Sequence, residues 1–241
     1  MVVPLISIIL LCPLAAFAFF GLLSLTGRNF TRQDLVSTAA VLIAAICSFL
    51  LLPQLSSDAE PISLTWVEIS DVSLSMGFYF DSVTAVMLLV VTIVSSLVHI
   101  FSIGYMHGDS GYTRYFAYLN LFVFAMLILV LANNYLMMFV GWEGVGLCSY
   151  LLIGFWYEKK PATDAGKKAF IVNRIGDLGF LLAIFLLFTH LGALDYVGVF
   201  EAAPESLSYG GTVVTAVALL LLLGAIGKSA QVPLYVWLPD A

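Results

Sequence analysis

The chain has 241 residues, of which 62% belong to the hydrophobic set AVILMFWYC and only 10% are charged. Soluble domains carry about 25% charged residues, so this composition, with a mean hydropathy of +1.07, excludes a water-soluble globular protein, a disordered chain and a small disulfide scaffold. The net charge of −6 argues against a nucleic-acid partner, because proteins that bind phosphate backbones are basic. The composition predicts a protein whose main solvent is lipid.

Seven segments are apolar and, at roughly 20 residues or more, long enough to cross the hydrocarbon core of a bilayer as helices. We interpret the first segment as a membrane span and not as a signal peptide, because it carries no basic residue before Arg28 and is too long for the apolar part of a signal peptide. The sequence therefore predicts an all-α polytopic membrane protein. The expected spans are 2–25, 35–55, 82–105, 115–132, 135–156, 168–192 and 212–237.

Two connections are long enough to contain structure of their own. Residues 62–80 partly alternate apolar and polar side chains and are rich in β-branched residues, which predicts a small surface hairpin at about 60–80. Residues 197–208 are typical of a short helix that lies in the membrane interface.

The loop charges predict the direction of the chain across the membrane. If the N-terminus lies outside, every basic loop residue falls on the inner side and the outer loops carry only acidic residues. The positive-inside rule then places the N-terminus on the outer side and the end of the chain on the cytoplasmic side. The basic residues are Arg28, Arg32, Arg114, Lys159, Lys160, Lys167 and Lys168, and the acidic ones are Asp58, Glu60, Glu68, Asp71, Asp195, Glu201 and Glu205.

Four ionisable side chains remain inside the predicted spans: Glu143, Arg174, Asp177 and Lys228. Each costs about 2.5–3.5 kcal/mol at the bilayer centre on insertion scales, and their formal charges sum to zero. We interpret them as a proton-carrying set that neutralises itself inside the bundle. A structural alternative stays open for each: an interhelical contact for Glu143, an intrahelical ion pair for Arg174 and Asp177, and a lysine that snorkels to the interface.

Lys228 is the most informative of the four, because it precedes Pro233 in GAIGKSAQVPLYVWLPDA. A proline removes a backbone donor and clashes with the carbonyl four residues before it, which predicts a broken seventh helix with an ammonium near the break. Broken helices line the binding cavities of transporters. Glu143 and Lys228 would form a coupled pair, in which withdrawal of the carboxylate passes the lysine proton on, with Arg174 and Asp177 as the next gate.

The remaining reactive side chains predict less. The three cysteines lie in apolar stretches without ligand spacing, and neither a His/Cys cluster nor a glycine-rich loop between a strand and a helix occurs. The sequence therefore predicts no metal or cofactor in this chain. His99 and His190 are expected near span ends and His107 in a cytoplasmic loop. Histidines are common at such interfaces, so none of the three predicts a proton-carrying role on its own.

The stretch GWEGVGLCSYLLIGFW at 141–156 resembles the antiporter-like membrane-arm subunits of respiratory complex I, the family of bacterial subunit L and mitochondrial subunit 5. Further matching stretches are 116–134, 167–180 and 227–241, and the similarity covers essentially the whole chain. The resemblance implies proton translocation coupled to NADH oxidation and quinone reduction in other subunits. It assigns translocation roles to Glu143, Asp177 and Lys228, and it places FMN and the iron–sulfur clusters in partner subunits of the complex.

The resemblance also implies a division of the chain. Residues 1–110 would hold the first three helices and the outer hairpin, and 111–241 would begin the proton-translocating repeat with helices four to seven. Because family members are far longer, we expect the chain to be an N-terminal fragment that does not pump alone. The expected location is the bacterial cell inner membrane or, alternatively, the mitochondrial inner membrane.

Three other readings stay open. The A-type component of multisubunit sodium/proton antiporters, the main alternative, shares the fold and carries a similar glutamate motif, and a related membrane protein serves in inorganic-carbon uptake. Both would keep the proton chemistry without the quinone. A purely structural helical bundle would leave four buried charges unused.

Overall fold

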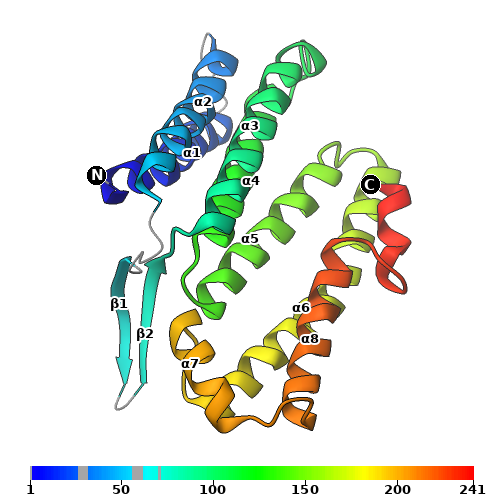
Figure 1. Ribbon diagram of the computed structural model, residues 1–241. Helices are drawn as coiled ribbons and strands as arrows, with labels where there is room; N and C mark the ends of the chain where they lie inside the picture. The colour runs from blue at the N-terminus through cyan, green and yellow to red at the C-terminus, as the bar shows by residue number, and fades with distance from the viewer. Residues whose placement is uncertain (1, 27–31, 56–61, 70–71) are drawn as a thin grey trace. The chain divides into compact units, whose positions relative to one another are not determined.

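The computed structural model describes all residues except 1, 27–31, 56–61 and 70–71, and these described residues form two compact units, Met1–Ala132 and Asn133–Ala241 (Figure 1). Six of the described helices are long and apolar enough to cross a membrane, which confirms the predicted polytopic all-α architecture. The functional division expected at 110/111 concerns roles rather than packing and stays a prediction. Of the loop charges used above, Arg28, Asp58, Glu60 and Asp71 lie outside the described residues.

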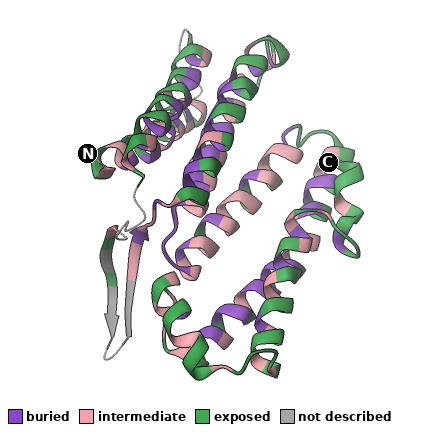
Figure 2. Ribbon diagram, viewed as in Figure 1, coloured by how far each residue is buried: buried purple, intermediate pink, exposed green. Residues whose placement is uncertain are grey.

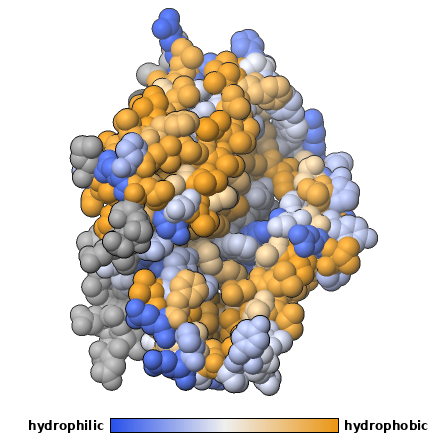
Figure 3. Space-filling view, in the orientation of Figure 1, coloured by the Kyte–Doolittle hydropathy of each residue, from blue (hydrophilic) through white to orange (hydrophobic). Residues whose placement is uncertain are grey.

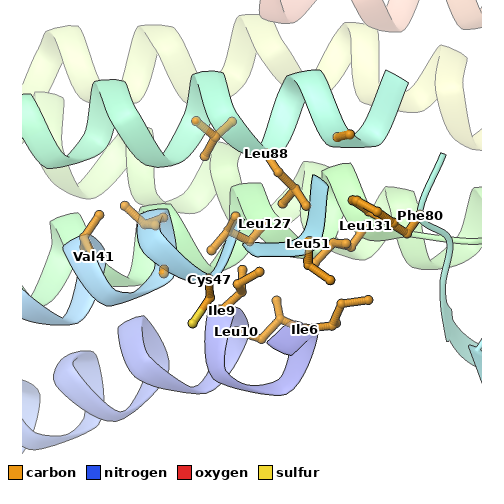
Figure 4. Close-up of a cluster of buried hydrophobic side chains, with 14 residues drawn as sticks. Ile6, Ile9, Leu10, Val41, Cys47, Leu51, Phe80, Leu88, Leu127 and Leu131 are labelled. Atoms are coloured by element: carbon orange, nitrogen blue, oxygen red, sulfur yellow. The ribbon is translucent and has the colours of Figure 1, made fainter. Parts of the chain in front are cut away.

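The first unit is a bundle of four helices: α1 (Val2–Leu25), α2 (Gln33–Leu51), α3 (Ser82–Tyr105) and α4 (Tyr112–Leu131). α1 packs against α2 and α4, and α3 packs against the same two helices. Side chains from all four helices meet in one apolar core, which includes Ile9, Val41, Leu88 and Leu127 (Figure 4). Because lipid gives apolar helices no hydrophobic reason to associate, this close packing is what holds the bundle together.

The outer surfaces of the helices are apolar as well. Large side chains such as Phe19, Ile46, Leu97 and Phe101 are exposed. Figure 2 shows exposed positions along the helices, and Figure 3 shows hydrophobic residues over much of the visible surface. An apolar outer face is unfavourable in water but suits contact with lipid chains. The distribution agrees with helices that stand in a bilayer.

A short 3₁₀ turn (η1, Leu52–Gln54) ends α2, and the predicted hairpin lies between α2 and α3. β1 (Ile62–Ile69) and β2 (Val72–Phe78) pair in antiparallel register, with an irregularity between Thr65 and Val67. Tyr79 N donates to Leu131 O at 2.8 Å, which fixes the base of the hairpin to the end of α4. The hairpin prediction is confirmed.

The second unit is built around α6 (Lys160–Leu191), which packs against α5 (Tyr135–Ile153), α7 (Tyr196–Ser206) and α8 (Thr212–Lys228). α6 begins at Lys160 rather than at the expected residue 168, because its first turns are charged and hydropathy detects only the apolar part of a helix. Proline in the first turn suits the start of a helix, and Gly192, with φ of 68°, ends it in the left-handed conformation that glycine adopts most easily. The predicted short helix at 197–208 is present as α7.

The predicted break in the seventh helix, within the expected span 212–237, is confirmed. α8 ends at Lys228, and the chain continues through a turn into a 3₁₀ segment, η2 (Leu234–Asp240). At 1.5 Å per residue α8 is about 26 Å long, shorter than the roughly 30 Å hydrocarbon core. The helix thus ends five residues before Pro233. Trp237 Nε1 donates a hydrogen bond to the Gly227 carbonyl oxygen at 3.1 Å, which satisfies one of the free carbonyls at the end of α8.

Candidate functional site

All four intramembrane charges predicted from the sequence lie in the second unit, on three helices that pack together. Arg174 on α6 donates a hydrogen bond to the carboxylate of Glu143 on α5, and its Nη1 lies 3.8 Å from Asp177 Oδ2. Lys228 Nζ, at the end of α8, lies 3.6 Å from Asp177 Oδ1. The side chains thus form a row with alternating sign, in which each charge has an opposite neighbour. Such neighbours offset part of the cost of removing the charges from water.

The row differs from the direct Glu143–Lys228 coupling expected from the sequence. Arg174 and Asp177 lie between these two residues, so Glu143 and Lys228 are connected through them. The predicted pair of Arg174 and Asp177 exists, but it does not neutralise only itself: each member also contacts a charge on another helix. The intrahelical pair is therefore the central link of an interhelical arrangement.

Burial varies along the row. The side chain of Asp177 is 3% exposed and that of Lys228 is 17% exposed, whereas that of Arg174 is 39% exposed. Among the described residues, Asp177 Oδ2 and Lys228 Nζ have no hydrogen-bond partner. Buried charges that lack full hydrogen bonding are expensive, so the Asp177–Lys228 end of the row carries the larger cost of burial.

Trp142 is a member of the site that sequence reasoning missed. Its Nε1 donates to Asp177 Oδ1 at 2.6 Å, and its ring stacks on Phe180 with the centroids 5.0 Å apart. The centre of the same ring lies 5.8 Å from Lys228 Nζ. Trp142 therefore orients the buried carboxylate while contributing an aromatic surface beside the ammonium. The available signal was a tryptophan directly before an intramembrane glutamate.

We expect Trp142→Phe to lower the stability of the second unit, because phenylalanine keeps an aromatic ring but cannot donate to Asp177. A hydrogen bond to a charged group contributes about 1.5–3 kcal/mol. Thermal unfolding in detergent measures the difference, with Trp66→Phe on the exposed surface of β1 as the matched control. Equal unfolding temperatures for the two variants would contradict the role of the indole N–H.

Glycines bring the backbones of α6 and α8 into contact beside the charges. A Cβ atom on Gly176 would lie 3.0 Å from Leu223 O and 3.2 Å from Gly227 Cα, and one on Gly224 would lie 3.1 Å from Phe180 Cβ. Small residues allow this approach between membrane helices. Because Asp177 follows Gly176 and Lys228 follows Gly227, the crossing also sets the distance between the two charges.

Gly146 on α5 has a related role. A Cβ atom at this position would lie 2.6 Å from Lys228 Nζ, so the glycine leaves the space that the ammonium occupies. Sequence reasoning did not identify Gly146, since its relation to Lys228 depends on how α5 and α8 approach each other.

Two families match parts of the chain. Residues 132–241 match the family described as NADH:quinone oxidoreductase/Mrp antiporter, TM, and residues 66–116 match the one described as NADH-Ubiquinone oxidoreductase (complex I), chain 5 N-terminus.

Curated relatives agree with these matches. NADH-ubiquinone oxidoreductase chain 5 of Cryptococcus neoformans is 43% identical over 238 residues, which are 97% of this chain and 35% of the relative. NADH-quinone oxidoreductase subunit L of Mycobacterium tuberculosis is 50% identical over 177 residues, 73% of this chain and 28% of the relative. The chain thus spans about a third of the length of the curated relatives it matches.

Solved structures share the fold. The structure of the archaeal membrane-bound sulfane sulfur reductase aligns with a TM-score of 0.81 at 19% identity, over 98% of this chain and 47% of the other. The Mrp complex from Dietzia sp. DQ12-45-1b aligns with a TM-score of 0.78 at 24% identity, over 98% and 25%.

The fold and the charged row define a multi-pass membrane protein with an antiporter-like arrangement of helices. The chain belongs to the family of antiporter-like membrane subunits that includes chain 5 and subunit L of the NADH–quinone oxidoreductases.

Proposed function

We propose that the chain serves as a membrane-arm subunit of a proton-translocating NADH–quinone oxidoreductase. Protons would cross at this subunit while partner subunits oxidise NADH and reduce quinone. The observation that carries the proposal is the row Glu143–Arg174–Asp177–Lys228, which joins three helices with alternating charge. Family membership supports the complex in which this row would act.

The row suggests how a charge movement on one helix moves a proton on another. Two unit charges about 4 Å apart at an effective dielectric of about 20 attract each other by about 4 kcal/mol, roughly a thousandfold in a proton-binding equilibrium. While Arg174 holds Glu143, Asp177 is available to stabilise the Lys228 ammonium. If Arg174 turns to Asp177, the lysine loses much of that attraction and releases its proton to water.

The other parts of the proposal concern the surroundings of the chain. FMN and the iron–sulfur clusters would reside in partner subunits, so this chain would supply proton transfer and no redox step. The distribution of Lys and Arg supports an N-terminus on the outer side, in a bacterial inner membrane or, alternatively, in a mitochondrial one.

A second candidate function is that of the A-type component of a multisubunit sodium/proton antiporter. The name of the family matched by residues 132–241 includes the Mrp antiporter, and the fold is shared with an Mrp complex. The charged row would serve either function, because both need a buried group that takes up and releases a proton.

Isolation of the tagged chain from its native membrane separates the two candidates. Co-purification of NADH-oxidising activity and flavin absorbance is expected for the first. A complex that exchanges sodium for protons without oxidising NADH would overturn it in favour of the second.

In that complex, we expect Glu143→Gln to reduce proton transfer per NADH oxidised by about a hundredfold, the lower range for loss of a proton-transfer group. Glutamine keeps the shape and can still accept a hydrogen bond from Arg174, but it has no charge to compete with Asp177. Acidification of inverted vesicles measures the effect. Glu158→Gln, an exposed position in the loop after α5, is the control, and equal transfer by both variants would refute the role of Glu143.

A further inference from the structure

Each cation of the charged row lies beside an aromatic ring. The centre of the Trp142 ring is 5.8 Å from Lys228 Nζ, and the centre of the Phe170 ring is 4.5 Å from Arg174 Cζ. A cation within about 6 Å of a ring centre is attracted by the negative face of the ring. Unlike Trp142, Phe170 has no side-chain hydrogen bond to offer, so the ring face is what it contributes to the row.

Phe170 lies on the opposite side of Arg174 from Asp177. All three residues belong to α6, with Phe170 four residues before Arg174 and Asp177 three residues after it. Long side chains on a helix lean toward its N-terminus, so a guanidinium over the Phe170 ring extends away from Asp177. A turn of the guanidinium toward Asp177 would take it off the ring.

Two carboxylates compete for the guanidinium of Arg174. Arg174 donates a hydrogen bond to Glu143, while its Nη1 lies 3.8 Å from Asp177 Oδ2. A hydrogen bond to a carboxylate needs roughly 3 Å, so a movement of about 1 Å would exchange one acceptor for the other. Because both acceptors carry the same charge, a modest additional attraction from the ring is enough to favour one of them.

The Phe170 ring is itself held in place by α5. It packs against the Tyr150 ring, with the centroids 5.5 Å apart and the planes tilted by 58°. One turn earlier on α6, a Cβ atom on Gly166 would lie 3.3 Å from both Tyr150 O and Gly154 N, so the backbones of the two helices are in close contact here. The ring is therefore a fixed surface, and the guanidinium leaves it when Arg174 moves.

We propose that Phe170 is a positioning residue for Arg174. Its ring holds the guanidinium at Glu143 and away from Asp177. While the guanidinium stays over the ring, the Asp177 carboxylate remains available to Lys228. The bias toward Glu143 follows from the geometry of α5 and α6, whereas its consequence for proton transfer rests on the function proposed above.

Fluorinated phenylalanines in place of Phe170 test the proposal, because fluorine withdraws electron density from the ring face and nearly preserves its shape. The whole complex is labelled with nitrogen-15 arginine and carbon-13 aspartate, and magnetic resonance in lipid measures the dipolar coupling between guanidinium nitrogens and carboxyl carbons. The difference from an Arg174→Lys sample isolates the Arg174 contribution. We expect the ratio of Arg174 at Asp177 to Arg174 at Glu143 to rise about two- to fivefold, the size of a cation–π contact at a partly exposed site.

Proton transfer per NADH oxidised is measured on the same samples and is expected to fall as the fluorine content rises, because Arg174 then competes with Lys228 for Asp177 out of turn. The same replacements at Phe185, an exposed residue of α6, are the control and should change neither quantity. An Arg174–Asp177 coupling that does not change with fluorine content would overturn the proposal. A coupling that rises while proton transfer stays constant would confirm the positioning role and refute the Arg174 step of the proposed function.

Two natural substitutions separate the ring face from packing. Phe170→Leu keeps an apolar side chain without a ring, and we expect it to raise the share of Arg174 at Asp177 as the fluorinated rings do. Phe170→Tyr restores the ring face and is expected to recover the position at Glu143 that Phe170→Leu loses. Equal Arg174–Asp177 couplings in the two variants would contradict the role of the ring.

Discussion

Replacing Asp177 by asparagine is expected to destabilise the second unit by about 3–5 kcal/mol, the usual cost of removing one partner from a buried ion pair. Asparagine has nearly the same shape, so the loss comes from charge: Lys228 and Arg174 would face each other without the carboxylate between them. The unfolding temperature in detergent measures the change in stability. Proton transfer in the assembled complex is expected to fall with it.

Asp164→Asn on the exposed surface of the same helix is the matched control. It makes the same chemical change where water solvates the charge, so its effect on stability should lie within about 0.5 kcal/mol. If Asp177→Asn were as stable as Asp164→Asn, the central carboxylate would not hold the row together.

Gly176→Ala is expected to destabilise the second unit at the crossing of α6 and α8 and to slow proton transfer. The added methyl group would meet the Leu223 carbonyl oxygen at 3.0 Å, and backbone cannot rotate away as a flexible side chain can. Overpacking of this kind costs about 1–3 kcal/mol. We also expect slower proton transfer, because separation of the helices lengthens the 3.6 Å distance from Lys228 Nζ to Asp177 Oδ1.

Gly104→Ala provides the comparison, because a Cβ atom there would find nothing within 4 Å. Alanine is favoured over glycine in a helix by about 1 kcal/mol, so this variant should be neutral or more stable. A Gly176→Ala protein with the same gain would show that the two helices do not need their close contact.

The sequence predicted most of the architecture because lipid imposes a simple rule on it. A helix that crosses a bilayer must be apolar over its length, so the bounds of α1 and α3 follow from hydropathy alone. The rule fails where a helix leaves the bilayer: the charged first turns of α6 are helical although they are not apolar. Hydropathy alone would also continue α8 past Lys228, and it was Pro233 that predicted the break observed there.

The four charged residues could be found for the same reason, since ionisable groups are rare inside spans. The order of the four residues along the row could not be predicted from the sequence. That Arg174 and Asp177 connect Glu143 to Lys228 depends on the closeness of α5, α6 and α8, and this closeness depends on glycines whose contact partners are remote in the sequence. Trp142 is similar: only its distance from Asp177 distinguishes it from other aromatic residues in the spans.

The position of Lys228 as the final residue of α8 has an electrostatic consequence. The carbonyl end of a helix carries the equivalent of roughly half a negative charge, so the backbone dipole of α8 adds to Asp177 in holding the ammonium. This contribution falls off within the last turn. A movement that unwinds or extends the end of α8 by a few residues would thus change how tightly the lysine holds its proton, even with every side chain of the row in place. A change in the length of α8 would therefore shift the proton-binding equilibrium of Lys228.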